Sequence, residues 1–189
     1  MFLENLHLKW LATMKILFTL AIAFSLTGCG NFATGRYSIS TDNAVALRSL
    51  SGIQLNVGNF TDKDNISEIS CHSHGPVTTL DGETFASYIQ KAFTDELKMS
   101  GIYLKTAPVT ITGRLDHIDY STAFASKWDL TLTLNSSNGK SVTVTENYDY
   151  KGSVFAAPGG ECVQAALAFA PAVQNLIGKA IEQLPEISN

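Results

Sequence analysis

Apolar residues are distributed along the chain in one continuous run and several periodic stretches. The continuous run covers residues 16–26, well short of the length that a bilayer-spanning helix needs, about 20 apolar residues. Over residues 84–99 apolar side chains recur at intervals of three and four, which predicts an amphipathic helix. Thr84 is suited to cap the start of that helix, and Gly101 is suited to its left-handed end.

Strict alternation of apolar and polar residues predicts strands. One lies around Ile53–Val57, and three more follow over residues 109–115, 128–135 and 142–151. Asn138-Gly139 separates the last two, and this dipeptide is a strong β-hairpin signal, so these two strands should be antiparallel neighbours. The polar side of these strands is rich in Thr and Asn and should face water.

Two stretches lack such periodicity. Residues 29–51 are rich in Gly, Ser, Thr and Asn, which predicts a flexible tether. Residues 61–83 contain turn-forming residues, including Gly75-Pro76 and Asp81-Gly82, which predicts a loop without a pair of strands. The folded domain is therefore expected over residues 52–189.

A final helix is predicted where apolar residues recur at helical spacing between Val173 and Leu184. Pro171 fits its first turn, where a missing N–H has no cost, and Pro185 should end it. The Ala-rich stretch 163–170 is compatible with an earlier helical segment that joins across a kink at Pro171.

The order of elements is strand, helix, three strands, helix. A sheet with one apolar face needs a cover, and two amphipathic helices of this length supply it. We therefore expect an α+β fold, a two-layer sandwich in which about four mostly antiparallel strands are covered on one face by two helices. The opposite face of the sheet should stay in water or contact a partner.

The apolar run at 16–26 has the layout of an export signal. Lys15 precedes it, and the small residues of Leu26-Thr27-Gly28-Cys29 close it where a signal is cleaved. A buried core helix and an ordinary signal without lipid are the alternatives, but a Cys directly after Leu-Thr-Gly favours the lipidated form. The sequence thus predicts a lipoprotein signal peptide over residues 1–28, with Met14 as the expected translation start and Met1 as the alternative.

The same motif resembles the lipobox of bacterial lipoproteins. The resemblance implies that Cys29 is acylated, that the chain is cut before it, and that a further acyl group is then added. Two or more acyl chains anchor a protein stably, whereas one holds it only marginally. Gly30 stands where Asp would retain a lipoprotein in the inner membrane, so the resemblance implies the outer membrane, facing the periplasm.

The charge balance excludes some partners. Without Glu4, Lys9 and Lys15 of the signal, the chain carries 11 basic and 16 acidic side chains, a formal charge of −5. This mild acidity argues against nucleic-acid binding and against a polybasic grip on lipid. The 161 residues after the signal are enough for one domain with a single core.

Cys71 and Cys162 remain once Cys29 is assigned to lipid. An even pair in an oxidising compartment most simply forms a disulfide. For a separation of 91 positions the chain-entropy model gives an upper figure of roughly 4–5 kcal/mol.

A metal site is the alternative for the same region. The run Cys71-His72-Ser73-His74 offers thiolate and imidazole ligands, which suit zinc or copper, and His117 or Cys162 are further candidates. The spacing matches no strong zinc pattern, so a solvated loop beside a disulfide is the preferred interpretation.

Several short motifs support a resemblance to a protein class. They are Leu97-Lys98-Met99-Ser100-Gly101-Ile102, Ile111-Thr112-Gly113-Arg114-Leu115, Trp128-Asp129-Leu130-Thr131-Leu132 and Ile181-Glu182-Gln183-Leu184-Pro185. With the export signal and the element order, they resemble small Gram-negative envelope lipoproteins of the LptE type, the YajG type and the auxiliary lipoproteins of lipid-handling ABC transporters. The resemblance implies a non-enzymatic module that docks on a barrel, a transporter or another envelope component.

Catalytic signatures are missing from the sequence: it contains no nucleophile elbow, zinc-protease helix or phosphate-binding glycine loop. Asp116, His117 and Asp119 share one strand, but in a regular strand Asp116 points away from the other two. We therefore expect no enzyme activity and no cofactor. The expected partner is an envelope protein or lipid, bound by a sheet edge, by the Thr-rich face or by the loop 121–127 with Phe124.

Overall fold

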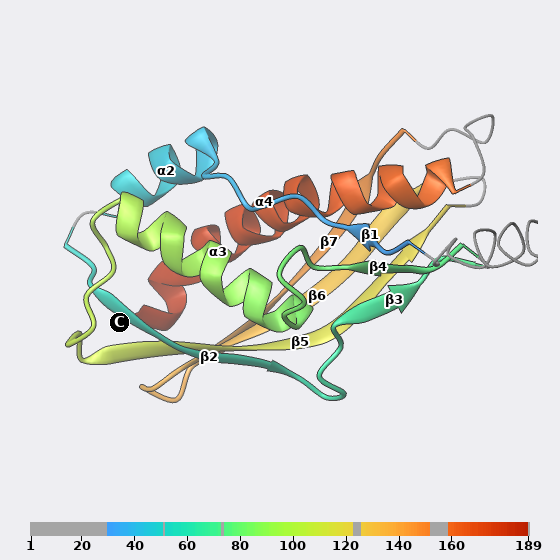
Figure 1. The fold of residues 1–189 in the computed structure, drawn as a ribbon. Helices are drawn as coiled ribbons and strands as arrows, with labels where there is room; N and C mark the ends of the chain where they lie inside the picture. Colours follow the sequence, from blue (N-terminus) through green and yellow to red (C-terminus); the bar gives the residue numbers. More distant parts are fainter. Residues whose placement is uncertain (1–29, 51, 73, 123–125, 152–158, 189) are drawn as a thin grey trace, which may run out of the picture. The chain divides into compact units, whose positions relative to one another are not determined.

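A four-stranded sheet forms one layer of the structure, a computed structural model that describes residues 30–50, 52–72, 74–122, 126–151 and 159–188 (Figure 1). The strands lie in the order β2-β5-β6-β7, with β2 parallel to β5 and the other pairs antiparallel. Their bounds are β2 Leu55–Asp62, β5 Val109–Ser121, β6 Lys127–Ser136 and β7 Ser141–Asp149.

Two helices cover one face of this sheet. Helix α3, Phe85–Met99, lies over β2 and β5, and helix α4, Gly160–Ser188, lies over β6 and β7 (Figure 1). The Thr84 hydroxyl caps α3 by accepting the Ser87 N–H, and Gly101 follows the helix with a φ of 75°. The predicted two-layer α+β sandwich and its first helix are therefore confirmed.

The predicted hairpin is also present. Strands β6 and β7 pair antiparallel around Asn138-Gly139, and Gly139 has a φ of 90°, which favours glycine. Thr131 lies opposite Thr145 and their hydroxyls approach to 3.3 Å, while Thr143 and Thr145 are exposed. The polar side of the hairpin faces water as the alternation predicts.

Aromatic side chains fill the space between the layers. Trp128 of β6 is fully buried and packs between Tyr120 and Phe169, at ring distances of 4.9 and 5.0 Å. Its indole N–H donates to the Ala165 carbonyl of α4 at 2.8 Å. The polar end of a large core residue is thus satisfied by the helix that covers it.

Residues 30–50 are not the predicted tether. They contain β1, Phe32–Ala33, and helix α2, Thr41–Arg48, which packs on α3 and α4. Gly178 of α4 makes this approach possible, because a Cβ there would lie 2.9 Å from the Asn43 side chain. The prediction was wrong because α2 has only a weak apolar face and is held by contacts with distant elements.

The loop predicted over residues 61–83 contains two short strands. They are β3, Glu68–Ser70, and β4, Pro76–Thr78, which pair antiparallel and form a second sheet of order β1-β4-β3. β1 pairs with β4 in parallel. Strands of three residues are too short to show a period of two, so the pattern indicated a loop instead.

The final helix is longer than predicted. Pro171 and Pro185 both lie inside α4, which runs without interruption from Gly160 to Ser188. The carbonyl that Pro171 leaves without an N–H partner belongs to Leu167, an exposed residue, so water can reach that turn. Burial along the rest of α4 outweighs the lost hydrogen bond. Among the described residues, no helix has the length and apolar character needed to cross a membrane.

Candidate functional site

One end of the described body lies next to the predicted lipid attachment site in the sequence. We call it the β1 end: β1, the β3–β4 loop at residues 71–75, and the first turn of α4. Cys29 itself lies outside the described residues, and only Gly30 and Asn31 separate it from β1. Because β1 pairs with β4, the chain is fixed to the body almost directly after Cys29.

The two remaining cysteines meet at this end. Cys71 in the β3–β4 loop is bonded to Cys162 in the first turn of α4, with a Cα–Cα distance of 5.9 Å, and both side chains are fully buried. The predicted disulfide is present. It joins the small sheet to the helix layer, so two separate segments of the β1 end are held together by a covalent bond.

The disulfide removes the sulfur ligand from the proposed metal site. The two histidines have other neighbours: His72 Nε2 lies 2.8 Å from Thr122 Oγ1, and His74 Nε2 lies 3.7 Å from Glu161 Oε1. Ser73 lies outside the described residues. Within the part of the chain that the structure describes, no three His, Cys, Asp or Glu side chains are arranged to hold a metal ion.

The outer face of the four-stranded sheet, which the helices do not cover, carries polar side chains that alternation in the sequence assigned to opposite faces. A β-bulge between Leu115 and His117 makes Asp116 an extra residue on β5, and Asp116 accepts a hydrogen bond from Thr133 on the outer face. Asp116, His117 and Asp119 therefore share one face, and the expectation that Asp116 points away is wrong. That expectation assumed a regular strand.

Asp129 lies at the centre of these outer-face polar groups. It is opposite Asp119 on the neighbouring strand, and its carboxylate accepts bonds from Lys127 at 3.0 Å and Asn147 at 2.9 Å. Burial opposes ionisation, but these bonds and the charges of Lys127 and His117 outweigh it and lower the pKa of Asp129. The outer face therefore presents an ordered, charged and hydrogen-bonded surface that the helices leave uncovered.

The β7 edge of this sheet is less suited to docking. On the edge strand β7, Glu146 is buried against the helix layer, and Lys179 of α4 pairs with it at 2.7 Å. A charge that points inward makes an edge strand a poor template for pairing with another chain. Phe124, in the loop 121–127 that was expected to dock, lies outside the described residues.

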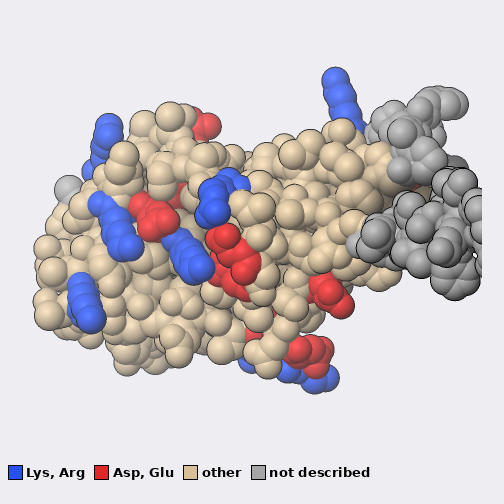
Figure 2. All heavy atoms as spheres, viewed as in Figure 1, with Lys and Arg blue, Asp and Glu red and all other residues tan. Residues whose placement is uncertain are grey.

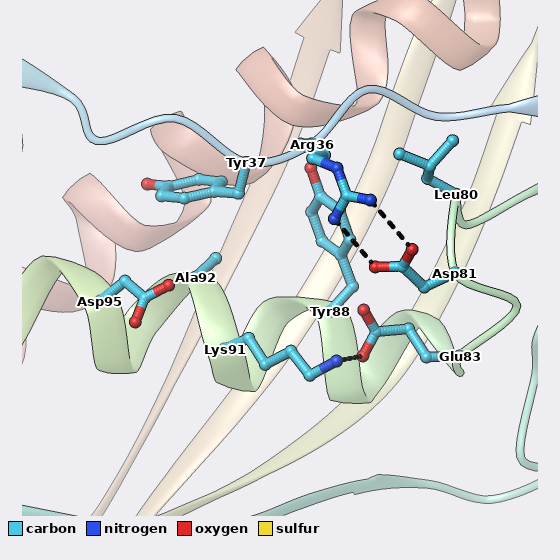
Figure 3. A pocket seen from close by; sticks show the side chains of 9 residues that line it. All are labelled: Arg36, Tyr37, Leu80, Asp81, Glu83, Tyr88, Lys91, Ala92 and Asp95. Carbon is cyan, nitrogen blue, oxygen red and sulfur yellow. Dashed lines mark hydrogen bonds and ion pairs between the residues drawn. The ribbon is translucent and has the colours of Figure 1, made fainter.

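A shallow pocket of about 290 Å³ opens between residues 36–37, the loop at 80–83 and α3 (Figure 3). Two ion pairs line it: Arg36 with Asp81 at 3.2 Å, and Lys91 with Glu83 at 2.8 Å. The full lining is Arg36, Tyr37, Leu80, Asp81, Glu83, Tyr88, Lys91, Ala92 and Asp95. On this side of the molecule, charges of both signs are mixed over α3, without a patch of one sign (Figure 2).

The pocket wall is held by a buried carboxylate behind it. Glu96 of α3 is fully buried, and its Oε1 accepts from the Tyr37 hydroxyl at 2.6 Å, the Ser40 N–H at 2.8 Å and the Asn43 amide at 3.3 Å. Burial, the hydrogen bond to Glu96 and its negative charge raise the pKa of Tyr37. Glu96 thus fastens the segment that leads from β1 into α2 onto α3.

Glu96 stands three positions after Phe93, on the apolar face of the helix that the sequence predicts over residues 84–99. The signal was available, because an acidic residue on the buried face of an amphipathic helix needs a partner. The partners were not visible, because they lie more than 50 positions away in a segment that has no periodic pattern.

Comparisons with known proteins give a fold but no family. No family model matches the sequence, and no curated protein is significantly similar to it. The fold is similar to that of protein XCC0632 from Xanthomonas campestris, of the DUF330 family, with a TM-score of 0.56, 11% identity, and coverage of 82% of this chain and 94% of that one. A PelC dodecamer from Paraburkholderia phytofirmans gives a TM-score of 0.42 at 14% identity, covering 82% and 92%. The first similarity establishes a shared α+β fold.

Proposed function

We propose that this chain is a lipid-anchored envelope lipoprotein that faces the periplasm from the outer membrane. In this proposal it acts as a non-enzymatic binding or assembly module for an outer-membrane or transport complex. The observation that carries it is the Leu26-Thr27-Gly28-Cys29 motif, placed two residues before a folded body. The Cys71–Cys162 disulfide adds support, because such bonds persist in oxidising compartments outside the cytosol.

The outer face of the four-stranded sheet is the surface that we assign to the partner. Both covering helices lie on the opposite face, and Thr143, Thr145 and Asn147 are exposed on the outer one. Hydroxyl, amide and carboxylate groups at fixed positions favour a protein partner that is recognised by hydrogen bonds. The inward-facing Glu146 on β7 disfavours docking by strand addition.

Replacing Cys29 by Ser tests the anchor. We expect the unaltered protein to incorporate labelled palmitate and to fractionate with the outer membrane, because two or more acyl chains anchor stably. The Cys29→Ser variant should lose the label and should no longer fractionate with the outer membrane. Its mass, lower by two hydrogens than that of the reduced chain, checks that the disulfide still forms. Absence of palmitate from the unaltered protein would contradict the proposal.

Photo-crosslinking in intact cells tests the partner surface. A benzophenone amino acid at Thr145, on the exposed outer face, should give one discrete adduct with an envelope protein. The same group at Val45, a 64% exposed position on α2, is the matched control and should give no such adduct. Equal adducts from both positions, or none from Thr145, would show that the outer face is not the docking surface.

A further inference from the structure

The outer side of α4 carries an apolar stripe that is covered at one end only. Val163 and Leu167 lie four positions apart on one face of the helix, and they are 42% and 58% exposed. Two turns further along the same face, Gln174 donates to the Ser38 carbonyl at 2.7 Å, so the segment between β1 and α2 covers the helix there. Among the described residues, nothing covers the stripe at the β1 end.

The short chain segment between Cys29 and β1 would keep a lipid on Cys29 near the Val163 and Leu167 side chains. Three residue steps join Cys29 to Phe32, and an extended chain of that length spans about 10 Å. β1 contacts α4, and Phe32 lies beside Gly159, where an added Cβ would be 3.1 Å from its ring. Leu167 is about 10 Å along the helix axis from Gly160, the first residue of α4.

β1 is fixed to the rest of the body, and the described chain before it consists of Gly30 and Asn31. β1 pairs with β4, and the Thr34 N–H donates to the Thr78 carbonyl at 2.8 Å. The Cys71–Cys162 bond then joins the β3–β4 loop to the first turn of α4. A lipid on Cys29 would therefore keep the start of α4 within a short chain length of the headgroups.

We propose that Val163 and Leu167 rest on the bilayer that holds the Cys29 lipid, so that the start of α4 is a second membrane contact. This inference rests on the proposed lipid anchor. The occupant is the lipid surface because the acylated residue is only a short chain length from the stripe. Exposed apolar side chains beside an anchor add buried area to the membrane contact. The outer face of the sheet, on the other layer, is left free for its partner.

Tryptophan quenching by brominated lipid tests the contact. The native tryptophans are Trp10, in the predicted signal, and Trp128, which is fully buried and gives a constant background. Leu167→Trp is the test variant and Met99→Trp the control. Met99 is 67% exposed and is the last residue of α3, whose C-terminal end lies away from β1 (Figure 1). Both lipidated proteins are reconstituted in vesicles of phosphatidylethanolamine and phosphatidylglycerol, with and without bromine on the acyl chains.

We expect brominated lipid to lower the added emission at position 167 at least two-fold and to leave that at position 99 unchanged. Val163→Trp provides a second test position should Leu167→Trp fail to fold. Flotation with the vesicles is measured in the same samples. A protein that does not float lacks the anchor, and the proposed function itself fails. A protein that floats without selective quenching at 167 has the anchor but not the contact. A concentration-dependent blue shift at 167 without quenching would mean that a second copy covers the stripe, which also overturns the proposal.

Discussion

We expect the Cys71→Ala/Cys162→Ala double variant to lose about 4 kcal/mol of unfolding free energy. The bond closes a separation of 91 positions, and in the chain-entropy model a loop of that length strongly restricts the unfolded chain. Both side chains are fully buried, so alanine leaves small cavities that add to the loss. The measurement is urea unfolding followed by Trp128 fluorescence, in the Cys29→Ser background, which has no third thiol.

Reduction provides the control for this experiment. Dithiothreitol should lower the stability of the protein that retains both cysteines to near that of the double variant, and should leave the double variant unchanged. A loss below about 1 kcal/mol would contradict the expectation. It would mean that the pairing of β1 with β4 and the packing of α4 already fix the β1 end without the bond.

Replacing Glu96 by Ala should lower the unfolding free energy by about 3 kcal/mol or more. The substitution removes the acceptor shared by Tyr37, Ser40 and Asn43, and a buried donor left without a partner costs about 1–3 kcal/mol. The Tyr37 and Ser40 donors are partly buried, and the Asn43 amide keeps its bond to the Gln174 carbonyl. Glu96→Gln keeps the accepting oxygen and should lose less than half as much. Hydrogen exchange gives the second measurement, because α2 should lose protection before α4 does.

Asp95→Ala is the matched control, one position away on the same helix. Asp95 is half exposed and pairs with Lys98 at 3.4 Å, an ion pair of the exposed kind that contributes about 0.5 kcal/mol. The expectation would be contradicted if the two alanine variants lost the same unfolding free energy, or if hydrogen exchange in α2 did not change when Glu96 is replaced. Glu96 would then not be the residue that holds the segment before α2 on α3.

The sequence predicts those elements that have a long periodic pattern of apolar residues and that end at recognisable capping or turn residues. α3 has an apolar face over its whole length together with Thr84 and Gly101, and the β6–β7 hairpin has Asn138-Gly139. α2 and the small sheet could not be predicted, because short segments gain their stability from contacts with residues far away in the chain. Pro171 led to a wrong prediction of where α4 begins. The rule that proline disrupts a helix considers only local backbone hydrogen bonds, and the burial of α4 against the sheet outweighs it.

Of the features in the candidate site, only the disulfide could be predicted, because it follows from the number of cysteines in the sequence. Two cysteines remain once Cys29 is assigned to lipid, they can form one bond with each other, and Cys71 and Cys162 do so. The grouping of Asp116 with His117 depends on one extra residue in β5, and alternation alone cannot locate a bulge. The pocket beside Arg36 is built from three separate segments, so no local pattern could indicate it.

The parallel pairing of β2 with β5 also determines when the body can form. β2 can pair with β5 only after residues 63–108, which contain β3, β4 and α3, have connected the two strands in space. Closing such a loop costs chain entropy before the stabilising contacts between the two strands can form, so pairings of this kind slow folding. Until β5 arrives, the newly made first half exposes apolar surface, which makes it the stage of biogenesis at which aggregation is the greatest hazard and a chaperone is most useful.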